Sequence, residues 1–477
     1  MKYIATIGLE VHVQLLTKTK MFCACKTDYG SLPNTQVCPV CLGYPGALPV
    51  INEEAIRLTV LTGLMLCSKI NSSSKFDRKN YFYPDMPKNY QISQYDCPFC
   101  TGGELDVICG ERIKKVKLTR IHLEEDVAKN MHVGDRSSID FNRAGHPLME
   151  IVTDPDIDSP EEAFAFLLAL KQILAYGLIS RSNLEEGNVR CDINCSVRPE
   201  NQPQLGVKAE IKNLNTFKGV LQALKYEIKR QTEVLISGGV IVQETRRWDS
   251  ERGLTESMRS KEEAHDYRYF PDPDLLPVVL TEEQINRWNN DIPELPRQKC
   301  ARIVSQYGIP EYDAKVLSSD KALADFFEEA AGLSANPKTL SNWVMTEMLR
   351  MLSEKEIEIS AAKISPKSLA ELVRLTESGK VNSNSAKQIF AVMFEKGGSP
   401  EQLISEMGLA QVSDESELEK IVKQAIIDNS KSVADYQGGK EVALKYLIGQ
   451  VMRLSRGKAN PHVVQELLKK VLSKEGA

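Results

Sequence analysis

The sequence predicts an α+β fold: a mixed-sheet body at residues 1–292, an all-α helical domain at 293–408 and a small helical tail domain at 409–477. Strict apolar–polar alternation, typical of half-buried strands, occurs only in the first 290 residues, where turns and a few helical patterns separate the strands. Beyond that point helical patterns follow one another. The length of 477 residues also exceeds what one hydrophobic core supports, so two to four domains are expected.

The expected strands of the body are the alternating segments IGLEVHVQL (7–15), VRCDINCSV (189–197) and GVKAEIKNL (206–214). Helical periodicity predicts helices at 52–67, 160–176 and 216–236, the last ended by Ser-Gly-Gly. After IPELP, helices are expected at 296–307, 322–331, 337–352, 366–378 and 384–395. The segment KGGSP (396–400) is typical of a linker to the tail.

Composition narrows the class of protein. The formal net charge of −5 gives no overall attraction to a polyanion, so nucleic-acid binding would need a local basic patch. We find neither a signal-peptide pattern nor an apolar run of membrane-spanning length, and therefore expect a cytoplasmic protein. In a reducing compartment the eleven cysteines favour metal ligands or catalytic thiols over disulfides.

Four cysteines stand out by their spacing, C-x-C, twelve residues, then C-x-x-C: Cys23, Cys25, Cys38 and Cys41. The pattern leaves open a reactive thiol centre, a disulfide framework or a metal clamp. A second C-x-x-C pair, Cys97 and Cys100 with Cys109 nearby, has no evident fourth ligand, so structural thiols are the favoured interpretation there.

Alternation in the first strand places Glu10 and His12 on one face, where a carboxylate and an imidazole can share a divalent cation. From this segment alone a solvated strand face is the simpler interpretation. In RIHLEED, however, Glu125 falls in register with the apolar Ile121 and Leu123, which marks either the end of the strand or a site.

Two later strands also carry charged residues on one face: Arg190 and Asp192 in the first, Glu210 in the second. Carboxylates for Mg²⁺ and cations for phosphate suit phosphoryl transfer, in which catalysis is largely positioning and charge neutralisation. The segment FDRKNYFYPDMPKNYQISQ (76–94) could cover a nucleotide or a nucleic-acid end, or be an ordinary aromatic loop. Walker A, kinase glycine-rich and Rossmann motifs are absent from the sequence.

These segments, with NRAGHPLMEIVTDPDI, QETRRWD, DYRYFPDPDLLP and GQVMRLSRGKANP, resemble the B subunits of tRNA-dependent aspartyl/glutamyl amidotransferases over essentially the whole chain. The related archaeal E subunits carry a large insertion for which 477 residues leave no room. The resemblance implies a cradle-like catalytic domain at 1–292 that uses ATP and Mg²⁺ to phosphorylate the side-chain carboxylate of Glu on tRNA(Gln) or Asp on tRNA(Asn). It also implies a heterotrimer, in which ammonia from glutamine hydrolysis on the amidase (A) subunit gives the amide and a small C subunit joins the other two.

The resemblance also implies roles for particular residues. Glu10, His12 and Glu125 match the magnesium site, with His12 neutral when metal is bound, and Glu125→Ala is expected to abolish amidation. Asp192 and Glu210 match a further ion site or the ammonia path. Phosphate contacts are expected from Lys79, Arg78 and Arg190.

For the four spaced cysteines, the resemblance argues against catalysis, because some family members lack them. Four thiolates suit a closed tetrahedral zinc site, so Cys23, Cys25, Cys38 and Cys41 are expected to form a structural zinc clamp beside the first strand.

The tail resembles the family's tRNA-binding domain. Residues 440–477 contain eight Lys and Arg, including Arg456 and Lys458, against three acids. Contacts to RNA phosphates and shape are therefore expected, although composition alone would favour a solvated helix face.

Two other classes of function remain as alternatives: a glutaminase with a cysteine nucleophile, for which His146 has no evident partner, and a pure tRNA-binding or assembly module. The second would explain the tail but not the carboxylates on the strand faces.

Overall fold

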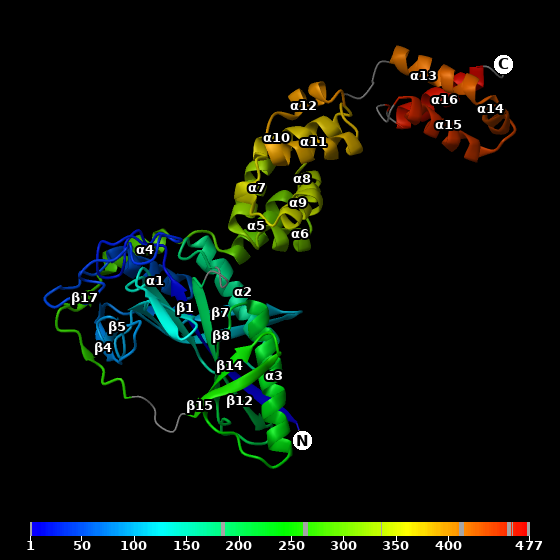
Figure 1. The fold of residues 1–477 in the computed structure, drawn as a ribbon. Helices are drawn as coiled ribbons and strands as arrows, with labels where there is room; N and C mark the ends of the chain where they lie inside the picture. Colours follow the sequence, from blue (N-terminus) through cyan, green and yellow to red (C-terminus); the bar gives the residue numbers. More distant parts are fainter. Residues whose placement is uncertain are drawn as a thin grey trace. The chain divides into compact units, whose positions relative to one another are not determined.

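The computed structural model describes residues 2–182, 187–260, 266–334, 336–409, 415–455, 459 and 461–474. It divides into two compact units, Met1–Leu295 and Pro296–Ala477, close to the predicted boundary at residue 292. All the described strands lie in the first unit, and the described part of the second is helical (Figure 1). The predicted α+β class is confirmed.

The first unit is built on a mixed sheet whose strands, in the described residues, number ten. Along the sheet they are β15 (Leu254–Ser260), β14 (Glu244–Asp249), β13 (Ala209–Lys212), β12 (Val189–Pro199), β1 (Tyr3–Gln14), β11 (Pro147–Thr153), β8 (Arg112–Glu125), β6 (Cys100–Thr101) and β2 (Lys69–Ile70), with β7 (Glu104–Cys109) paired to β8. Strands β13 and β14 are parallel, whereas β1 is antiparallel to both of its neighbours. The three strands expected from alternation are confirmed as β1, β12 and β13.

Shorter strands form separate ribbons: β16 (Phe270–Pro271) with β4 (Asp77–Asn80) and β5 (Tyr90–Ser93), β17 (Val278–Val279) with β3 (Ser73–Ser74), and β9 (Lys129–Val133) with β10 (Arg136–Asp140). The helices of this unit are α1 (Glu53–Met65), α2 (Pro160–Tyr176), α3 (Phe217–Ile236) and α4 (Glu282–Asn290). Helices α2 and α3 pack side by side, and α3 also contacts β12 and β15 (Figure 1). The first three helices were predicted; α4 was not.

The central strand β1 separates an apolar face of the sheet from a polar one. Leu9, Val11 and Val13 are buried in the core with residues from α1, α2 and α3. Glu10 and His12 alternate with them and stay partly exposed on the opposite face. The same alternation continues on β12, so burying one face of the sheet leaves a row of polar side chains on the other.

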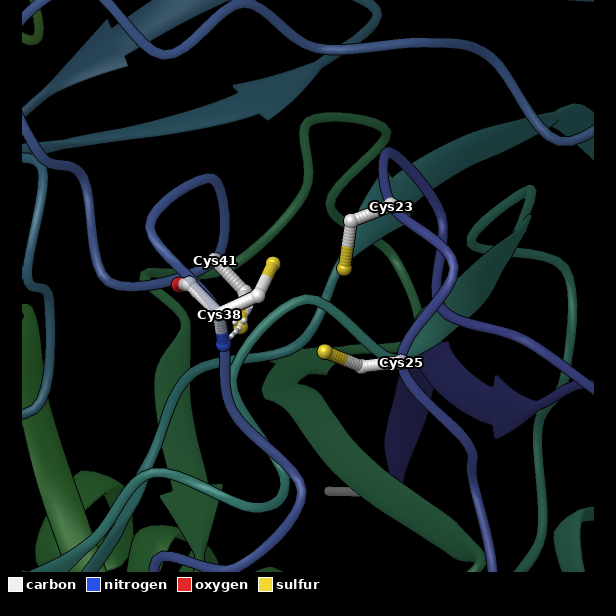
Figure 2. Close-up of side chains that lie close together, drawn as sticks. All are labelled: Cys23, Cys25, Cys38 and Cys41. Atoms are coloured by element: carbon white, nitrogen blue, oxygen red, sulfur yellow. Dashed lines mark hydrogen bonds between the residues drawn. The ribbon is translucent and has the colours of Figure 1, made fainter.

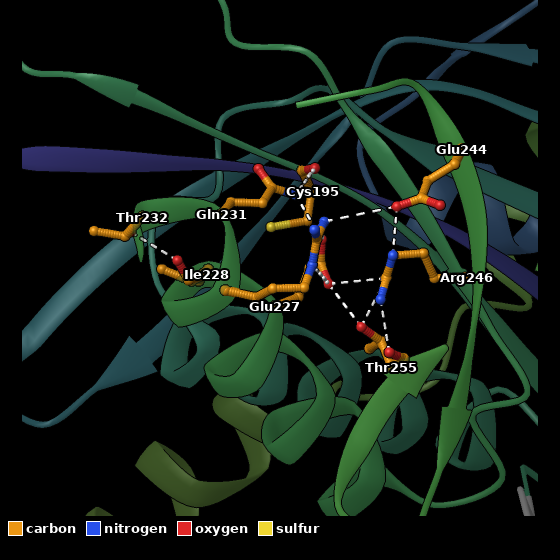
Figure 3. Close-up of polar contacts among 9 residues, drawn as sticks. Cys195, Glu227, Ile228, Gln231, Thr232, Glu244, Arg246 and Thr255 are labelled. Atoms are coloured by element: carbon orange, nitrogen blue, oxygen red, sulfur yellow. Dashed lines mark hydrogen bonds and ion pairs between the residues drawn. The ribbon is translucent and has the colours of Figure 1, made fainter. Parts of the chain in front are cut away.

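A buried charge network fastens α3 to the sheet (Figure 3). Glu227 is fully buried; it accepts from Arg230 Nη2 at 2.6 Å and from Thr255 Oγ1 at 2.8 Å, and it lies 3.4 Å from Arg246 Nε. Gln231 donates to Glu227 at 2.8 Å and to the Cys195 carbonyl at 3.1 Å. This network joins α3 to β12, β14 and β15.

Glu227→Ala is expected to lower the free energy of unfolding by about 3–5 kcal/mol, because it leaves buried guanidinium groups without their carboxylate. Glu233→Ala, on the exposed side of the same helix, should change it by less than about 1 kcal/mol. Urea unfolding of both variants checks this. Equal losses would show that the network contributes nothing beyond helix propensity.

The second unit contains, in its described residues, α5 (Pro296–Tyr307), α6 (Glu311–Leu317), α7 (Lys321–Gly332), α8 (Pro337–Trp343), α9 (Leu349–Lys355), α10 (Pro366–Glu377), α11 (Ser383–Lys396), α12 (Pro400–Glu406), α13 (Glu415–Asp428), α14 (Ser430–Gln437), α15 (Glu441–Leu454) and α16 (Pro461–Lys474). A π-helical segment, Val344–Met348, interrupts the single helix predicted over 337–352. Residues 303–404 and 418–472 supply two separate apolar clusters. Among the described residues, no helix is long and apolar enough to cross a membrane.

Candidate active site and thiol centre

Strand register gathers imidazoles and carboxylates on the polar face of the sheet. His12 on β1 lies opposite Glu150 on β11 and opposite Arg190 on β12. Glu150 in turn lies opposite His122 on β8. Three adjacent strands therefore present His12, Glu150 and His122 side by side, and Glu124, two residues after His122, joins them.

The distances define a compact cluster. His12 Nε2 lies 3.4 Å from Glu150 Oε2 and 3.8 Å from Glu124 Oε1. His122 Nε2 lies 3.3 Å from Glu150 Oε2 and 3.9 Å from Glu124 Oε2, which also accepts from Ser93 Oγ at 3.2 Å. One ligand atom each from His12, Glu124 and Glu150 lie within 4.8 Å of one another, a spacing that could hold a metal ion.

The electrostatics of the cluster suit a cation. Burial lowers the pKa of His12, but the hydrogen bond and charge of Glu150 and the charge of Glu124 outweigh it and raise the pKa to about 9. Burial raises the pKa of Glu150, yet the imidazoles of His122 and His12 hold it well below its usual value. His122 Nδ1 is buried without a hydrogen-bond partner in the described structure. Two carboxylates and an imidazole are suitable ligands for a divalent cation.

The structure does not bring Glu125 to this cluster. Glu125 is the last residue of β8, and alternation sends its side chain to the face opposite Glu124. It is 4% exposed, accepts from the Lys88 ammonium and accepts from the Ile92 backbone N–H at 2.9 Å. Glu125, which falls in register with the apolar Ile121 and Leu123, therefore marks the end of the strand. This is one of the two interpretations that the sequence allowed.

Glu10, Asp192 and Glu210 lie on the polar face. Glu10 is opposite Asp192 in register and accepts from Asn194 Nδ2 at 2.8 Å. Asp192 and Glu210 meet around Lys212, whose Nζ is 2.8 Å and 3.0 Å from their carboxylates. Burial lowers the pKa of Lys212, but these two carboxylates outweigh it and raise the pKa. The structure brings Asp192 and Glu210 together with an ammonium between them, and their role as a further ion site or as part of the ammonia path stays a prediction.

The three cations expected to contact phosphate differ in their surroundings. Arg78 is held by Asp272 at 2.7 Å and by Asp274 at 2.8 Å. Arg190 is 2.7 Å from the buried Asp126.

Lys79 is the cation that remains available. Its Nζ lies 4.7 Å from the centre of the Tyr267 ring, and in the described part of the chain it has no ion pair with an acid. Tyr267 packs edge-on against Tyr269 at 6.1 Å between ring centres. Burial raises the pKa of Tyr269, and Glu124 and Glu150 raise it further, so this ring lies within the field of the cluster. Lys79 contacts Tyr267, Tyr267 contacts Tyr269, and the charges of Glu124 and Glu150 act on Tyr269.

Sequence reasoning missed His122, Glu124 and Glu150. The signal was present: Arg120, His122 and Glu124 alternate with Ile121 and Leu123, as His12 alternates with apolar neighbours on β1. The prediction rested on the residue that breaks this pattern rather than on those that keep it. Glu150 carried no comparable signal, because only the register of β11 places it opposite His12.

The four spaced cysteines form a second centre (Figure 2). Sγ atoms of Cys23, Cys25, Cys38 and Cys41 lie within 4.8 Å of one another, and the side chains converge from two loop segments after β1. Cys41 Sγ accepts from the Cys38 backbone N–H at 3.2 Å. The hydrogen bond from the Cys23 thiol lowers the pKa of Cys41 to about 4, although burial opposes this. This cluster could bind a metal.

Cys97, Cys100 and Cys109 do not join such a group. Within the described residues, the groups able to hold a metal are the four-cysteine cluster and the His12–Glu124–Glu150 cluster. Cys100 is fully buried, and burial raises its pKa, as expected for an inert structural thiol.

Comparisons with known proteins identify the family of the chain. Residues 5–286 match the GatB/GatE catalytic domain family, and residues 325–472 match the GatB domain family. The chain is 52% identical over 475 residues to the B subunit of the aspartyl/glutamyl-tRNA(Asn/Gln) amidotransferase of Caldanaerobacter subterraneus subsp. tengcongensis, covering 99% of this chain and 100% of that protein. It is 51% identical over 489 residues to the corresponding B subunit of Methylacidiphilum infernorum, covering 100% of both chains. The chain therefore belongs to the family of aspartyl/glutamyl-tRNA(Asn/Gln) amidotransferase B subunits.

Proposed function

We propose that this chain is the ligase subunit that converts the side-chain carboxylate of Glu-tRNA(Gln), Asp-tRNA(Asn) or both into the amide, using ATP. The observation that carries the proposal is the His12–Glu124–Glu150 cluster on the polar sheet face. Lys79, whose ammonium lies over the Tyr267 ring, adds a cation that no described acid pairs. Phosphoryl transfer to a carboxylate needs a bound cation and further positive charge for the phosphate, which this cluster and Lys79 would supply.

The chemistry explains why ATP is required. A carboxylate is a poor electrophile, so its oxygen attacks the γ-phosphorus, ADP leaves, and the acyl phosphate then loses phosphate to ammonia. His12, Glu124 and Glu150 would hold Mg²⁺, which when bound neutralises charge on the phosphates. A protonated imidazole cannot ligate a metal, so the cation must take the place of the His12 proton. Lys79 would pair with the transferred phosphate.

Ammonia has to come from elsewhere in the assembly. We propose that the amidase (A) subunit of a heterotrimer is its source and that a small C subunit is the third member, with the complex acting in the cytoplasm on mischarged tRNA. Asp192, Glu210 and Lys212 form a second polar group on the same sheet face and are candidates for a further ion site or for the ammonia path.

The four-cysteine cluster is proposed to hold zinc, because four converging thiols match a closed tetrahedral site with no open position. Metal analysis should find about one zinc per chain, and Cys41→Ser should lose it while the exposed Cys67→Ser retains it. If all four thiols of this cluster still react freely with a thiol reagent after zinc has been supplied, the assignment is contradicted.

The strongest rival function is a glutaminase with a cysteine nucleophile. Burial lowers the pKa of His146 to about 4, and in the described residues no cysteine thiol is hydrogen-bonded to an imidazole, as such an enzyme would need.

Two assays separate these functions. The assembled complex should cleave ATP in a manner dependent on mischarged tRNA, and the isolated chain should not hydrolyse glutamine. Glutamine hydrolysis by the isolated chain would overturn the proposal.

A further inference from the structure

A lysine six residues beyond the end of β1 is completely buried. Lys20 is 0% exposed, and its Nζ donates to Cys41 Sγ at 3.5 Å and to the Phe141 carbonyl oxygen at 3.2 Å. No carboxylate of the described residues lies within ion-pair distance of it. Because a buried ammonium without an anion is strongly destabilising, the surroundings of Lys20 must supply negative charge.

The carboxylate that lines the same cavity as Lys20 is already paired with another cation. Glu125 pairs with Lys88 in the same region, and both line a cavity of about 90 Å³ together with Lys20, Cys23 and Cys41. The three side chains surround Gly145: a Cβ added there would lie 3.5 Å from Cys41 Cβ, 3.5 Å from Lys20 Cδ and 3.9 Å from Glu125 Oε2. With Glu125 neutralised by Lys88, the anion left for Lys20 is the sulfur of Cys41.

The four-cysteine cluster can supply that charge. Four thiolates around one divalent metal carry a net charge of about −2, which is costly to hold beside the apolar core. A single ammonium hydrogen-bonded to one of the sulfurs offsets half of it. The Cys38 backbone N–H, 3.2 Å from the same sulfur, adds a second donor.

We propose that Lys20 is the counter-ion of the thiolate metal centre: a positioning residue whose ammonium binds Cys41 and ties the centre to the loop at Phe141. The proposal rests on the zinc site proposed above. It explains why a lysine occupies a fully buried position that would otherwise suit an apolar residue.

The first test is zinc retention by the full-length chain. Lys20→Met removes the charge at nearly constant volume, and loss of a partner that hydrogen-bonds a metal ligand typically weakens binding about 10–100-fold. Zinc transfer to a chromophoric chelator should therefore be at least about tenfold faster than in the parent chain. Lys18→Met, at an exposed position two residues away, should leave the rate unchanged.

The second test asks whether the effect passes through the thiolate. In the parent chain Lys20→Met should lower the unfolding temperature. In a Cys41→Ala background the ammonium has lost its anion, so the same substitution should raise the unfolding temperature or leave it unchanged. This double-mutant cycle remains readable even when the single variant folds poorly, because the double variant is then expected to recover.

The outcomes separate this proposal from the zinc site itself. If the parent chain binds zinc and the Lys20→Met variant retains it equally well, Lys20 is not the counter-ion, and the zinc site still stands. Equal destabilisation by Lys20→Met with and without Cys41 also overturns the counter-ion. A parent chain that binds no metal when supplied with zinc overturns both.

Discussion

Glu124→Gln is expected to abolish amidation, lowering its rate by about 10³-fold or more, which corresponds to about 4 kcal/mol of transition-state stabilisation. The amide keeps the size of the side chain and can still accept from Ser93 Oγ. It removes one of the two charges that face His12 and His122, and with it the strongest ligand type for a hard cation. Glutamine hydrolysis on the proposed amidase subunit needs neither Glu124 nor the cation and should continue.

The matched control is the neighbouring Glu125→Gln on the opposite face of β8. Its carboxylate pairs with Lys88, so its loss should lower the unfolding temperature and leave the Mg²⁺ dependence of the residual activity unchanged. Single-turnover amidation over a range of Mg²⁺ concentrations compares the two variants. A Glu124→Gln enzyme with full activity, beside a well-folded and inactive Glu125→Gln enzyme, would restore Glu125 as the ligand.

Deleting residues 409–477 is expected to weaken tRNA binding about 10–100-fold near 0.1 M salt, because lost phosphate contacts remove counterion release. Phosphoryl transfer should persist at saturating tRNA. The remaining helical residues have their own apolar cluster, from whose periphery the deletion removes the partly buried Leu409.

A double charge reversal tests the tail without removing it. Lys445 and Arg453 are exposed on α15, whereas Lys440 pairs with Asp435 at 2.9 Å; Arg456 and Lys458 lie outside the described residues. Lys445→Glu with Arg453→Glu should reduce the slope of affinity against salt concentration by about 2, one for each phosphate contact. An unchanged slope in this variant and in the deletion would show that the tail does not contact tRNA.

Much of the fold was predictable because local patterns decide it. Alternation around His12 and around Asp192 correctly marked β1 and β12, and the helix starting at Pro160 was predictable from Ser159, which caps it. The helix expected over 337–352 is interrupted at Val344–Met348 by a π-helical segment, which carries no pattern that periodicity can detect.

The site was predictable only where one strand carried the information. Glu10 and His12 follow from alternation alone. Glu150 joins His12 through the pairing of β11 with β1, which depends on sheet order rather than on local sequence. For Glu125 the sequence allowed either a site or the end of a strand. The choice depends on which face of β8 the hydrophobic core covers, and in the structure the core covers the face that carries Glu125.

The most direct test of the account follows the oxygen of the substrate. Glu-tRNA(Gln) or Asp-tRNA(Asn) labelled with ¹⁸O in the side-chain carboxylate is converted by the assembled enzyme with ATP, Mg²⁺ and glutamine, and the released phosphate is analysed by mass spectrometry. Phosphorylation of the carboxylate predicts one ¹⁸O atom in phosphate for each amide formed, and the Glu124→Gln enzyme should release no labelled phosphate. Unlabelled phosphate from the parent enzyme, or ¹⁸O in AMP, would contradict it.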